Sequence, residues 1–223
     1  MPVETFPALD EIGLIRAGFI QRIPGVDVRV PREEALSRLL PPHQACLAEA
    51  GVGEMTFATA GQVHGSRIAR VDHSSRFPVP DADGLLTTKR NLCLGIYVAD
   101  CAAVFLVDRL AHGIALVHSG KKGTELGIAP AAVEALCQAT GAAPADIIAQ
   151  ISPCIRPPHY EIDFAADIRR QLAGSGVQSI HDSGTCTASH PDTYYSYRRE
   201  KGLTGRLLAF LALAADATSS AGS

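Results

Sequence analysis

Three nearly uninterrupted apolar runs in the middle of the chain constrain its fold more than any other feature. They are LCLGIYV at 92–98, AVFLVD at 103–108 and GIALVH at 113–118. Runs of this length with few polar positions are typical of strands that are buried in a sheet. The 223 residues of the chain are enough to bury a substantial core around such strands.

Helical patterns and further strand-like segments alternate on both sides of these runs. Helices are expected over 33–51, with a break at Pro41 and Pro42, and over 129–139, 164–172 and 203–215. Strands are expected within 55–61, 66–72 and 146–151. This alternation predicts the α/β class. We expect a single domain over 1–215 and a disordered tail over 216–223.

Charge, the first residues and the cysteines argue against several classes of protein. The net charge is −3, with 20 Lys and Arg against 23 Asp and Glu, so no basic field predicts a nucleic-acid or membrane partner. The first ten residues lack a basic start and an apolar run, which favours a cytoplasmic protein. Six cysteines without a CxxC pair indicate reduced thiols rather than a disulfide scaffold. Of these, Cys46, Cys93 and Cys137 are expected to be small buried apolar residues.

Two histidines and one cysteine lie where strands are predicted to end. His64 is in QVHG between two expected strands, Cys101 is in YVADC where the first two apolar runs are interrupted, and His118 ends the third run. Two imidazoles and a thiolate would give zinc three of four ligands and leave one position open, as in catalytic sites. The three residues are separated by 37 and 17 positions, which is no local metal-binding spacing. Hydrogen-bonded histidines without a metal therefore remain the alternative.

Other polar residues near these positions are candidates for binding or catalysis. In SGKKGTELG, Lys121 and Lys122 lie between glycines, which suits an anion, although a solvated turn that caps a helix has the same pattern. Asp100 could orient a ligand or accept a proton, or it could be a turn aspartate. Arg206, with Arg198 and Arg199, could bind an anion or form surface ion pairs. Asp81 and Asp83 are interpreted as turn formers, and surface positions are expected for His43, His73, His112, His181 and His190.

Five motifs resemble, in matching order, signature blocks of the laccase-domain family, which was formerly called multicopper polyphenol oxidase. They are QVHG, DADGLLT with VADCAAVFLVD, VHSGKKGT, SPCI followed by YEI, and YSYRREKGLTGR. The resemblance extends over 56–213 and implies a layered α/β/β/α sandwich with mixed sheets. It also implies that His64, Cys101 and His118 bind zinc, and that Arg22 occupies the family's Thr-Arg position. Ordered co-occurrence of several blocks is more specific than any single motif.

The resemblance implies an enzyme that acts on purine nucleosides with phosphate. Family members are linked to purine nucleoside phosphorylase and adenosine deaminase activity, and we extend the expectation to methylthioadenosine phosphorylase activity. The chain departs from the family where HAGWRG is common, because it has His118 followed by SGKKG. A tryptophan and an arginine are thus both replaced by lysine, which is a point charge and not a bidentate fork.

Three alternatives to this function stay open at the level of sequence. Two His and one Cys also suit copper, as in a polyphenol oxidase, but no two of the eight histidines are separated by one residue as in the trinuclear cluster of true laccases. Cys101 and His118 could instead be the nucleophile and base of a metal-free hydrolase. A metal-binding scaffold without activity is the third alternative.

Overall fold

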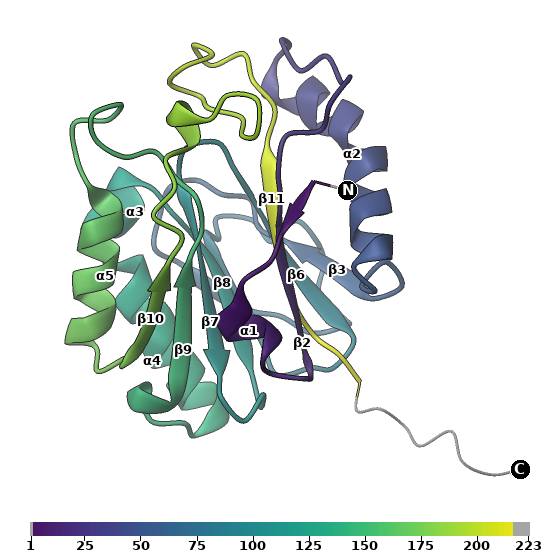
Figure 1. Cartoon of the computed structure of the whole chain (residues 1–223). Helices are drawn as coiled ribbons and strands as arrows, with labels where there is room; N and C mark the ends of the chain where they lie inside the picture. Colours follow the sequence, from purple (N-terminus) through teal and green to yellow (C-terminus); the bar gives the residue numbers. More distant parts are fainter. Residues whose placement is uncertain (1, 216–223) are drawn as a thin grey trace, which may run out of the picture.

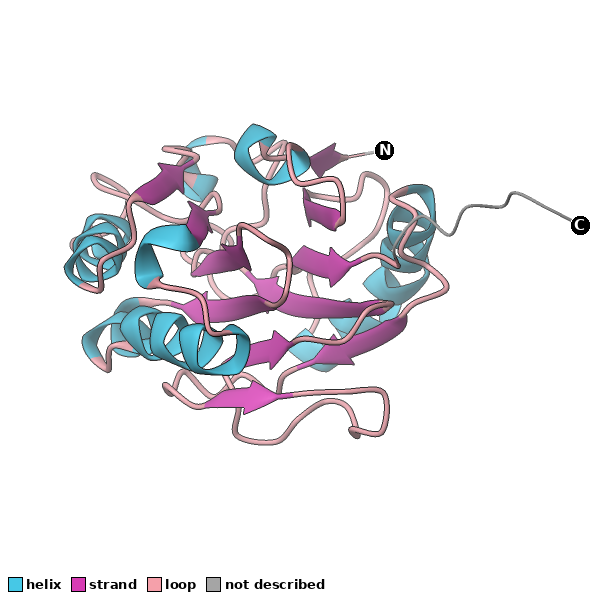
Figure 2. Ribbon diagram, turned by 90° about the horizontal axis from the view of Figure 1, so that it is seen from below, coloured by secondary structure: helices cyan, strands magenta, loops and turns pink. Residues whose placement is uncertain are grey.

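The computed structural model describes residues 2–215, and its strands form two mixed sheets that face each other (Figures 1 and 2). The first sheet has the order β1 (Val3–Glu4), β2 (Ile15–Ile20), β11 (Leu207–Leu213), β6 (Leu92–Val98) and β3 (Thr56–Thr59). The second has the order β10 (Ser179–Asp182), β9 (Ile147–Ile151), β7 (Ala102–Asp108), β8 (Ile114–Ser119), β5 (Gly84–Thr87) and β4 (Ile68–Arg70). The predicted class and the mixed sheets are thereby confirmed.

The helices are α1 (Pro7–Asp10), α2 (Arg32–Glu49), α3 (Lys121–Glu125), α4 (Ile128–Thr140) and α5 (Phe164–Gly174), with short 3-10 turns at Pro144–Asp146 and Thr187–Ser189. The short helix α1 contacts β2 and β9 and buries Leu9 in the core between the sheets, whereas the longer helices cover the outer faces. In Figure 1, α2 lies on the side of the first sheet, whereas α4 and α5 lie on the side of the second. The layers therefore follow the α/β/β/α order that the family resemblance implies.

Alternation along the strands divides the core between these layers. In β7, the odd-numbered residues Ala103, Phe105 and Val107 pack between the sheets, whereas the even-numbered residues from Ala102 to Leu106 pack under α4 and α5. Because successive side chains point to opposite faces of a strand, a strand covered on both faces is apolar at every position. This explains why the three central runs, now β6, β7 and β8, were predicted correctly.

The prediction of a final helix over 203–215 is wrong, because this segment contains strand β11. Leu207–Leu213 pairs antiparallel with β2 on one side and with β6 on the other. Its odd-numbered residues enter the core between the sheets, and its even-numbered residues face the cluster under α2. Leucine and alanine favour helices, but here burial between two neighbouring strands decides the conformation. The expected tail over 216–223 lies outside the described residues.

The helix predicted to break at Pro41 and Pro42 is instead continuous as α2. The surface position expected for His43 is wrong, because this residue of α2 is only 1% exposed. Packing of Ala35, Leu39 and His43 against the molecule compensates for the backbone hydrogen bonds that proline cannot donate. His73, His112, His181 and His190 are exposed as expected.

The chain crosses from one sheet to the other at two loops that matter for function. One loop, 60–67, joins β3 to β4, and the other, 99–101, joins β6 to β7. Because β7 pairs with β8 up to the pair Ala102 and Ser119, the second of these crossings comes close to the end of β8. Among the helices of the described residues, none combines the length and the apolar character needed to span a membrane.

Candidate metal centre and its cavity

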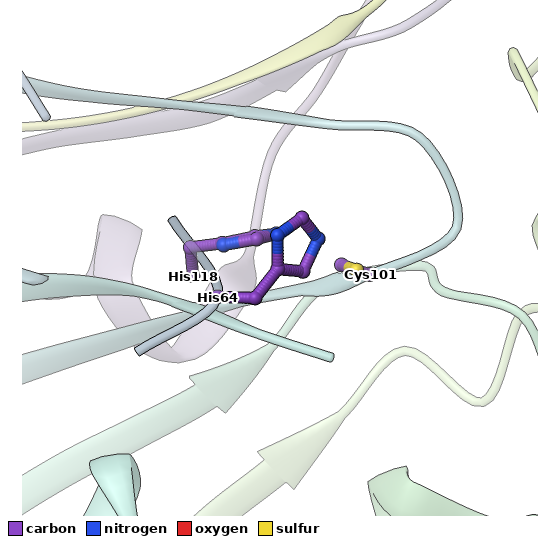
Figure 3. A group of neighbouring side chains, drawn as sticks. All are labelled: His64, Cys101 and His118. Carbon is purple, nitrogen blue, oxygen red and sulfur yellow. The ribbon is translucent and has the colours of Figure 1, made fainter. Parts of the chain in front are cut away.

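Three side chains from separate segments meet where the chain crosses between the sheets. His64 comes from the β3–β4 loop, Cys101 from the β6–β7 loop and His118 from the end of β8. Their donor atoms all lie within 4.8 Å of one another, and Figure 3 shows the two imidazole rings beside the cysteine. The rings are 4.7 Å apart between centroids, with their planes at 71°. The structure thus brings together all three predicted metal ligands.

His118 is held in one orientation by a buried carboxylate. The residue is 4% exposed, and its Nδ1 lies 2.9 Å from Oδ1 of Asp83. Because a carboxylate accepts hydrogen bonds, Nδ1 carries the proton and Nε2 is the nitrogen left for a ligand. The backbone N–H of His118 also donates to the carbonyl of Asp83 at 2.7 Å. The ring is therefore fixed from two sides.

The same carboxylate shapes the loop that carries His64. Asp83 accepts backbone N–H groups from Val63 at 3.1 Å, His64 at 2.9 Å and Gly65 at 2.7 Å. His64 itself has a φ of 60°, in the left-handed region that side chains other than glycine rarely adopt. One buried residue thus positions both histidines. Sequence reasoning interpreted Asp83 as a turn former and missed this role.

Close contacts set the protonation of the three central groups. Burial alone would lower the pKa of His118, but hydrogen bonds with Asp83 and Cys101 outweigh it and raise the pKa to about 9. Burial would raise the pKa of the Cys101 thiol, but hydrogen bonds with His118 and His64 lower it to about 7. Burial would raise the pKa of Asp83, but the hydrogen bonds from His118 and from the backbone of Gly65 and His64 together outweigh it and lower the pKa to about 2. A thiolate, the form that binds metals and attacks electrophiles, is therefore accessible near neutral pH.

A glycine gives the sulfur of Cys101 its space. A Cβ atom added to Gly120 would lie 2.5 Å from Sγ of Cys101, which is closer than real atoms approach. The backbone of Gly120 has a φ of −101° and a ψ of −166°, so the conformation itself does not require glycine. The requirement at this position is for room beside the thiol.

The donor set fits a divalent metal ion. Two histidine nitrogens and one thiolate are the ligands that a catalytic zinc takes, at about 2.0–2.3 Å, with a fourth position left open. The spacing of the three donors, within 4.8 Å, is compatible with one shared ion after small side-chain rotations. The carboxylate behind His118 is a further feature that zinc-binding histidines commonly have.

The three residues line a cavity with both aromatic and cationic walls. Its volume is about 630 Å³, within the range of roughly 300–1,000 Å³ usual for small-molecule sites. The aromatic residues on its wall are Tyr97, Tyr160, Phe164 and Tyr197. The cationic residues are Arg32, Lys121, Arg198 and Arg206. The cavity therefore offers stacking surfaces and positive charge beside the candidate metal centre.

The predicted phosphate-binding residues fall into two groups. Lys121 and Arg206 line the cavity, whereas Lys122 and Arg22 are not among the described residues that form its wall. Arg22 instead pairs with Glu200 at 2.8 Å and lies over the ring of Tyr195, 4.3 Å from its centroid. The SGKKGTELG segment is also less open than expected, since part of it forms helix α3.

Asp100 lies on the cavity wall but its carboxylate is occupied by the scaffold. It accepts hydrogen bonds from the hydroxyl of Thr187 at 2.7 Å, the hydroxyl of Ser196 at 3.1 Å and the backbone N–H of Arg198 at 2.7 Å. Its φ of 80° makes the turn that presents Cys101. These contacts agree with the alternative that Asp100 is a turn aspartate. They also show that its carboxylate binds groups of loops that are distant in sequence.

The sequence analysis did not single out three further wall residues, Gln62, Tyr97 and Arg32. Tyr97 is the last but one residue of β6, and the Gln62 side chain accepts from its N–H at 3.0 Å and donates to its carbonyl at 2.6 Å. Arg32 begins α2. A tyrosine within an apolar run and an arginine at a helix start are common surface patterns, so the sequence carried no signal for either position.

A family model described as "Multi-copper polyphenol oxidoreductase laccase" matches residues 42–167 and 161–214. Among curated proteins, the chain is similar to a purine nucleoside phosphorylase of Streptomyces coelicolor, with 32% identity over 72% of this chain and 76% of that one. It is also similar to the purine nucleoside phosphorylase YlmD of Geobacillus stearothermophilus, with 32% identity over 67% of this chain and 69% of that one.

The fold is similar to that of a solved structure, the hypothetical protein YfiH of Bacillus licheniformis. The TM-score is 0.81, with 24% sequence identity, and the match covers 92% of this chain and 94% of the other. This likeness extends the agreement to the N-terminal part of the chain, which the family model leaves unmatched.

Proposed function

Because the chain belongs to the multi-copper polyphenol oxidoreductase laccase family, with relatives named purine nucleoside phosphorylases, we propose that it cleaves purine nucleosides with phosphate. The observation that carries this proposal is the meeting of His64, Cys101 and His118 at a cavity of about 630 Å³. The stacking surfaces and the positive charge on the same wall suit a purine and an anion, respectively.

We assign zinc to the three donors. Bound there, zinc would supply a Lewis-acid centre with one open position on the cavity side. His118 is oriented for this by Asp83, and Cys101 is readily deprotonated beside it. Copper accepts the same donor types, so elemental analysis of the purified protein distinguishes the two metals.

The phosphorolytic step requires an anion held against the sugar. The bond between C1′ and the purine nitrogen breaks, a phosphate oxygen bonds to C1′, and the proton of the phosphate passes to the purine, giving free base and ribose 1-phosphate. Positive charge develops at C1′, so a nearby bound phosphate stabilises the transition state. Lys121, three positions after His118 and on the cavity wall, is our candidate to hold this phosphate, and Arg206 is assigned to the substrate.

The same proposal includes two further activities, methylthioadenosine phosphorolysis and adenosine deamination. Methylthioadenosine is a purine nucleoside with an apolar 5′ substituent, which Tyr160, Phe164 and Tyr197 on the wall would accommodate. Adenosine deamination would add water at C6 and release ammonia in the same cavity. Asp100 is assigned a positioning role, because three hydrogen-bond donors already hold its carboxylate beside Cys101.

One observation favours a second candidate function. Asp83, His118 and Cys101 form a carboxylate–imidazole–thiol series, in which His118 contacts both of the other groups. Cysteine hydrolases use such a series, with the thiolate as nucleophile and the imidazole as base. This candidate needs no metal, and alkylation of the thiol in chelated protein distinguishes it from the first.

The test of the proposed function is Cys101→Ala, with Cys137→Ala as the control. Cys137 is half-buried in α4 and is not a residue of the cavity wall. We expect Cys101→Ala to lose zinc by elemental analysis and to lose both inosine phosphorolysis and adenosine deamination, whereas the control keeps all three. Zinc and full turnover in Cys101→Ala would rule out the proposal. Activity that survives chelation but is abolished by iodoacetamide would favour the hydrolase.

A further inference from the structure

Two arginines from distant parts of the chain face the same stretch of cavity wall. Arg32 begins α2, and Arg206 directly precedes β11, yet both line the cavity that contains the candidate metal centre. They lie near enough to influence each other electrostatically. Burial lowers the pKa of Arg206, and the positive charge of Arg32 lowers it further.

No acidic side chain among the described residues pairs with either arginine. Arg206 is fixed by its Nη1 atom, which donates to the backbone carbonyls of Thr204 at 3.0 Å and Gly205 at 2.9 Å. These bonds leave the rest of its guanidinium available. Other arginines in the described chain do have carboxylate partners, namely Arg22, Arg38, Arg156, Arg170 and Arg198.

Two guanidinium groups on one cavity wall repel each other. The negative charges of Cys101 and Asp100 oppose part of this effect at Arg206, but neither forms an ion pair with it, and both arginines line the cavity with hydrogen-bond donors to spare. An anion between them would remove the repulsion, and two planar guanidinium groups match the oxygens of a phosphate with paired hydrogen bonds. The wall around Arg32 and Arg206 therefore has the chemistry of a phosphate site.

The two arginines come from other elements than Lys121, the cation already assigned to phosphate. Arg32 acts electrostatically on Tyr97, where burial raises the pKa and the charge of Arg32 opposes that change. Lys121 instead belongs to α3, directly after β8 and His118. The cavity thus presents positive charge from two groups of elements, and phosphorolysis of a free nucleoside requires only one bound phosphate.

We propose that Arg32 and Arg206 bind a phosphate group carried by the substrate, so that the preferred substrate is a purine nucleoside 5′-monophosphate. This inference rests on the proposed function for the purine and for the reaction. In the step, the bond from C1′ to the purine breaks and an oxygen of orthophosphate bonds to C1′. The orthophosphate proton goes to the purine, and the products are the free base and ribose 1,5-bisphosphate.

The experiment compares binding of inosine and inosine 5′-monophosphate to the full-length, metal-loaded protein by calorimetry without orthophosphate. Neither ligand has a 6-amino group, and phosphorolysis cannot proceed under these conditions. We expect the monophosphate to bind roughly 10- to 100-fold more tightly, the range for charge-assisted hydrogen bonds. Arg32→Gln and Arg206→Gln should each remove most of this ratio.

Arg29→Gln is the matched control, because Arg29 is an exposed arginine just before α2 that does not line the cavity. It should keep the ratio of the wild-type protein. Arg32 is also exposed, so its replacement should not disturb folding, and circular dichroism checks this. Equal binding of the two ligands to the wild-type protein, or a ratio that persists in both cavity variants, would overturn the proposal.

A titration with orthophosphate tests whether the two arginines bind free orthophosphate rather than the phosphate group of a substrate. If the two arginines hold orthophosphate instead, Arg32→Gln weakens its binding and the monophosphate has no advantage over inosine, which contradicts the proposal. The two hypotheses can fail separately. Phosphorolysis of inosine without a preference for the monophosphate leaves only the proposed function, whereas arginine-dependent binding of the monophosphate without any phosphorolysis leaves only the phosphate site.

Discussion

Asp83 connects more of the candidate centre than any other single side chain that the structure describes. It orients His118 and holds the backbone of Val63, His64 and Gly65. An asparagine would place an amide NH₂ group against backbone N–H donors, because one carboxylate oxygen of Asp83 serves Val63 and Gly65 together. The loop and the ring would then lose their shared anchor.

We therefore expect Asp83→Asn to reduce metal affinity about 10- to 100-fold, as for other partners of metal-binding histidines. Competition with a zinc chelator measures this change. Asp81→Asn is the control, because Asp81 is an exposed carboxylate two positions away and should leave affinity unchanged. Equal metal affinity in Asp83→Asn and the wild-type protein would contradict the assigned role.

Gly120 provides a second prediction for a single residue. In Gly120→Ala the new methyl group would meet Sγ of Cys101 at 2.5 Å, so the thiol must move. Overpacking of this kind costs about 1–3 kcal/mol, and we expect metal affinity to fall by at least about tenfold. Gly174→Ala is the control, since no heavy atom lies within 4 Å of its added Cβ. If both variants bind metal alike, the spacing at Gly120 is not required.

The sequence indicates which residues carry the candidate metal-ligand atoms, but it gives less information about the residues that orient those side chains. His64, Cys101 and His118 could be selected because motifs place each of them at a strand end. Asp83 could not, because its role arises only when β5 pairs with β8 and brings Gly84 opposite Val117. Pairing between segments some thirty positions apart leaves no mark in local composition.

At the level of elements, β11 shows why local propensity failed. Leu207–Leu213 consists of leucine, alanine and one phenylalanine, and every residue is buried. A strand with one solvent-exposed face would have polar residues at alternate positions, but this strand packs against a hydrophobic cluster on each face. Leucine and alanine then indicate helix. The neighbours β2 and β6, which decide the outcome, both lie more than 100 positions earlier in the chain.

Helix α2 carries a prediction about pH through His43. Both ring nitrogens of this buried residue lack hydrogen-bond partners among the described residues, and burial lowers its pKa from 6.5 to about 4. The folded protein therefore keeps His43 neutral, while the unfolded chain takes up a proton below pH 6.5. The stability associated with the neutral form is complete above pH 6.5 and is lost as the pH falls toward 4, by about 3 kcal/mol in total.

We expect His43→Leu to be more stable than the wild-type protein, with a difference that grows as the pH decreases from 6.5 to 4. Replacing unsatisfied buried nitrogens by an apolar group should add about 1–3 kcal/mol even at pH 7. Urea unfolding at several pH values measures both effects. His181→Leu, at an exposed position, should not change the pH dependence. A parallel pH profile for His43→Leu and wild type would refute this interpretation.

For the whole molecule, the main prediction concerns the link between metal binding and stability. The three donors come from loops and strands that are far apart in sequence and meet only in the folded state, so a metal ion should favour folding. At a free zinc concentration 100 times the dissociation constant, the gain is about 2.7 kcal/mol. For a chain of this size this corresponds to a rise in Tm of roughly 5–10 °C.

Differential scanning fluorimetry with zinc and with a chelator tests this expectation. Cys101→Ala is the control variant and should show little response to either addition. The same thermal shift in Cys101→Ala as in the wild-type protein would mean that zinc stabilises the fold through other groups.

The positions of the three donors have a mechanical consequence. His64 lies on one connection between the layers and Cys101 on a second one, while His118 belongs to a strand of the second sheet. Any sliding of one layer over the other would stretch or compress this triangle of donors. If cobalt, which absorbs visible light, were bound by these donors, a change in their spacing would shift its absorption bands. Those bands would therefore report repacking between the sheets at a distance from the ion.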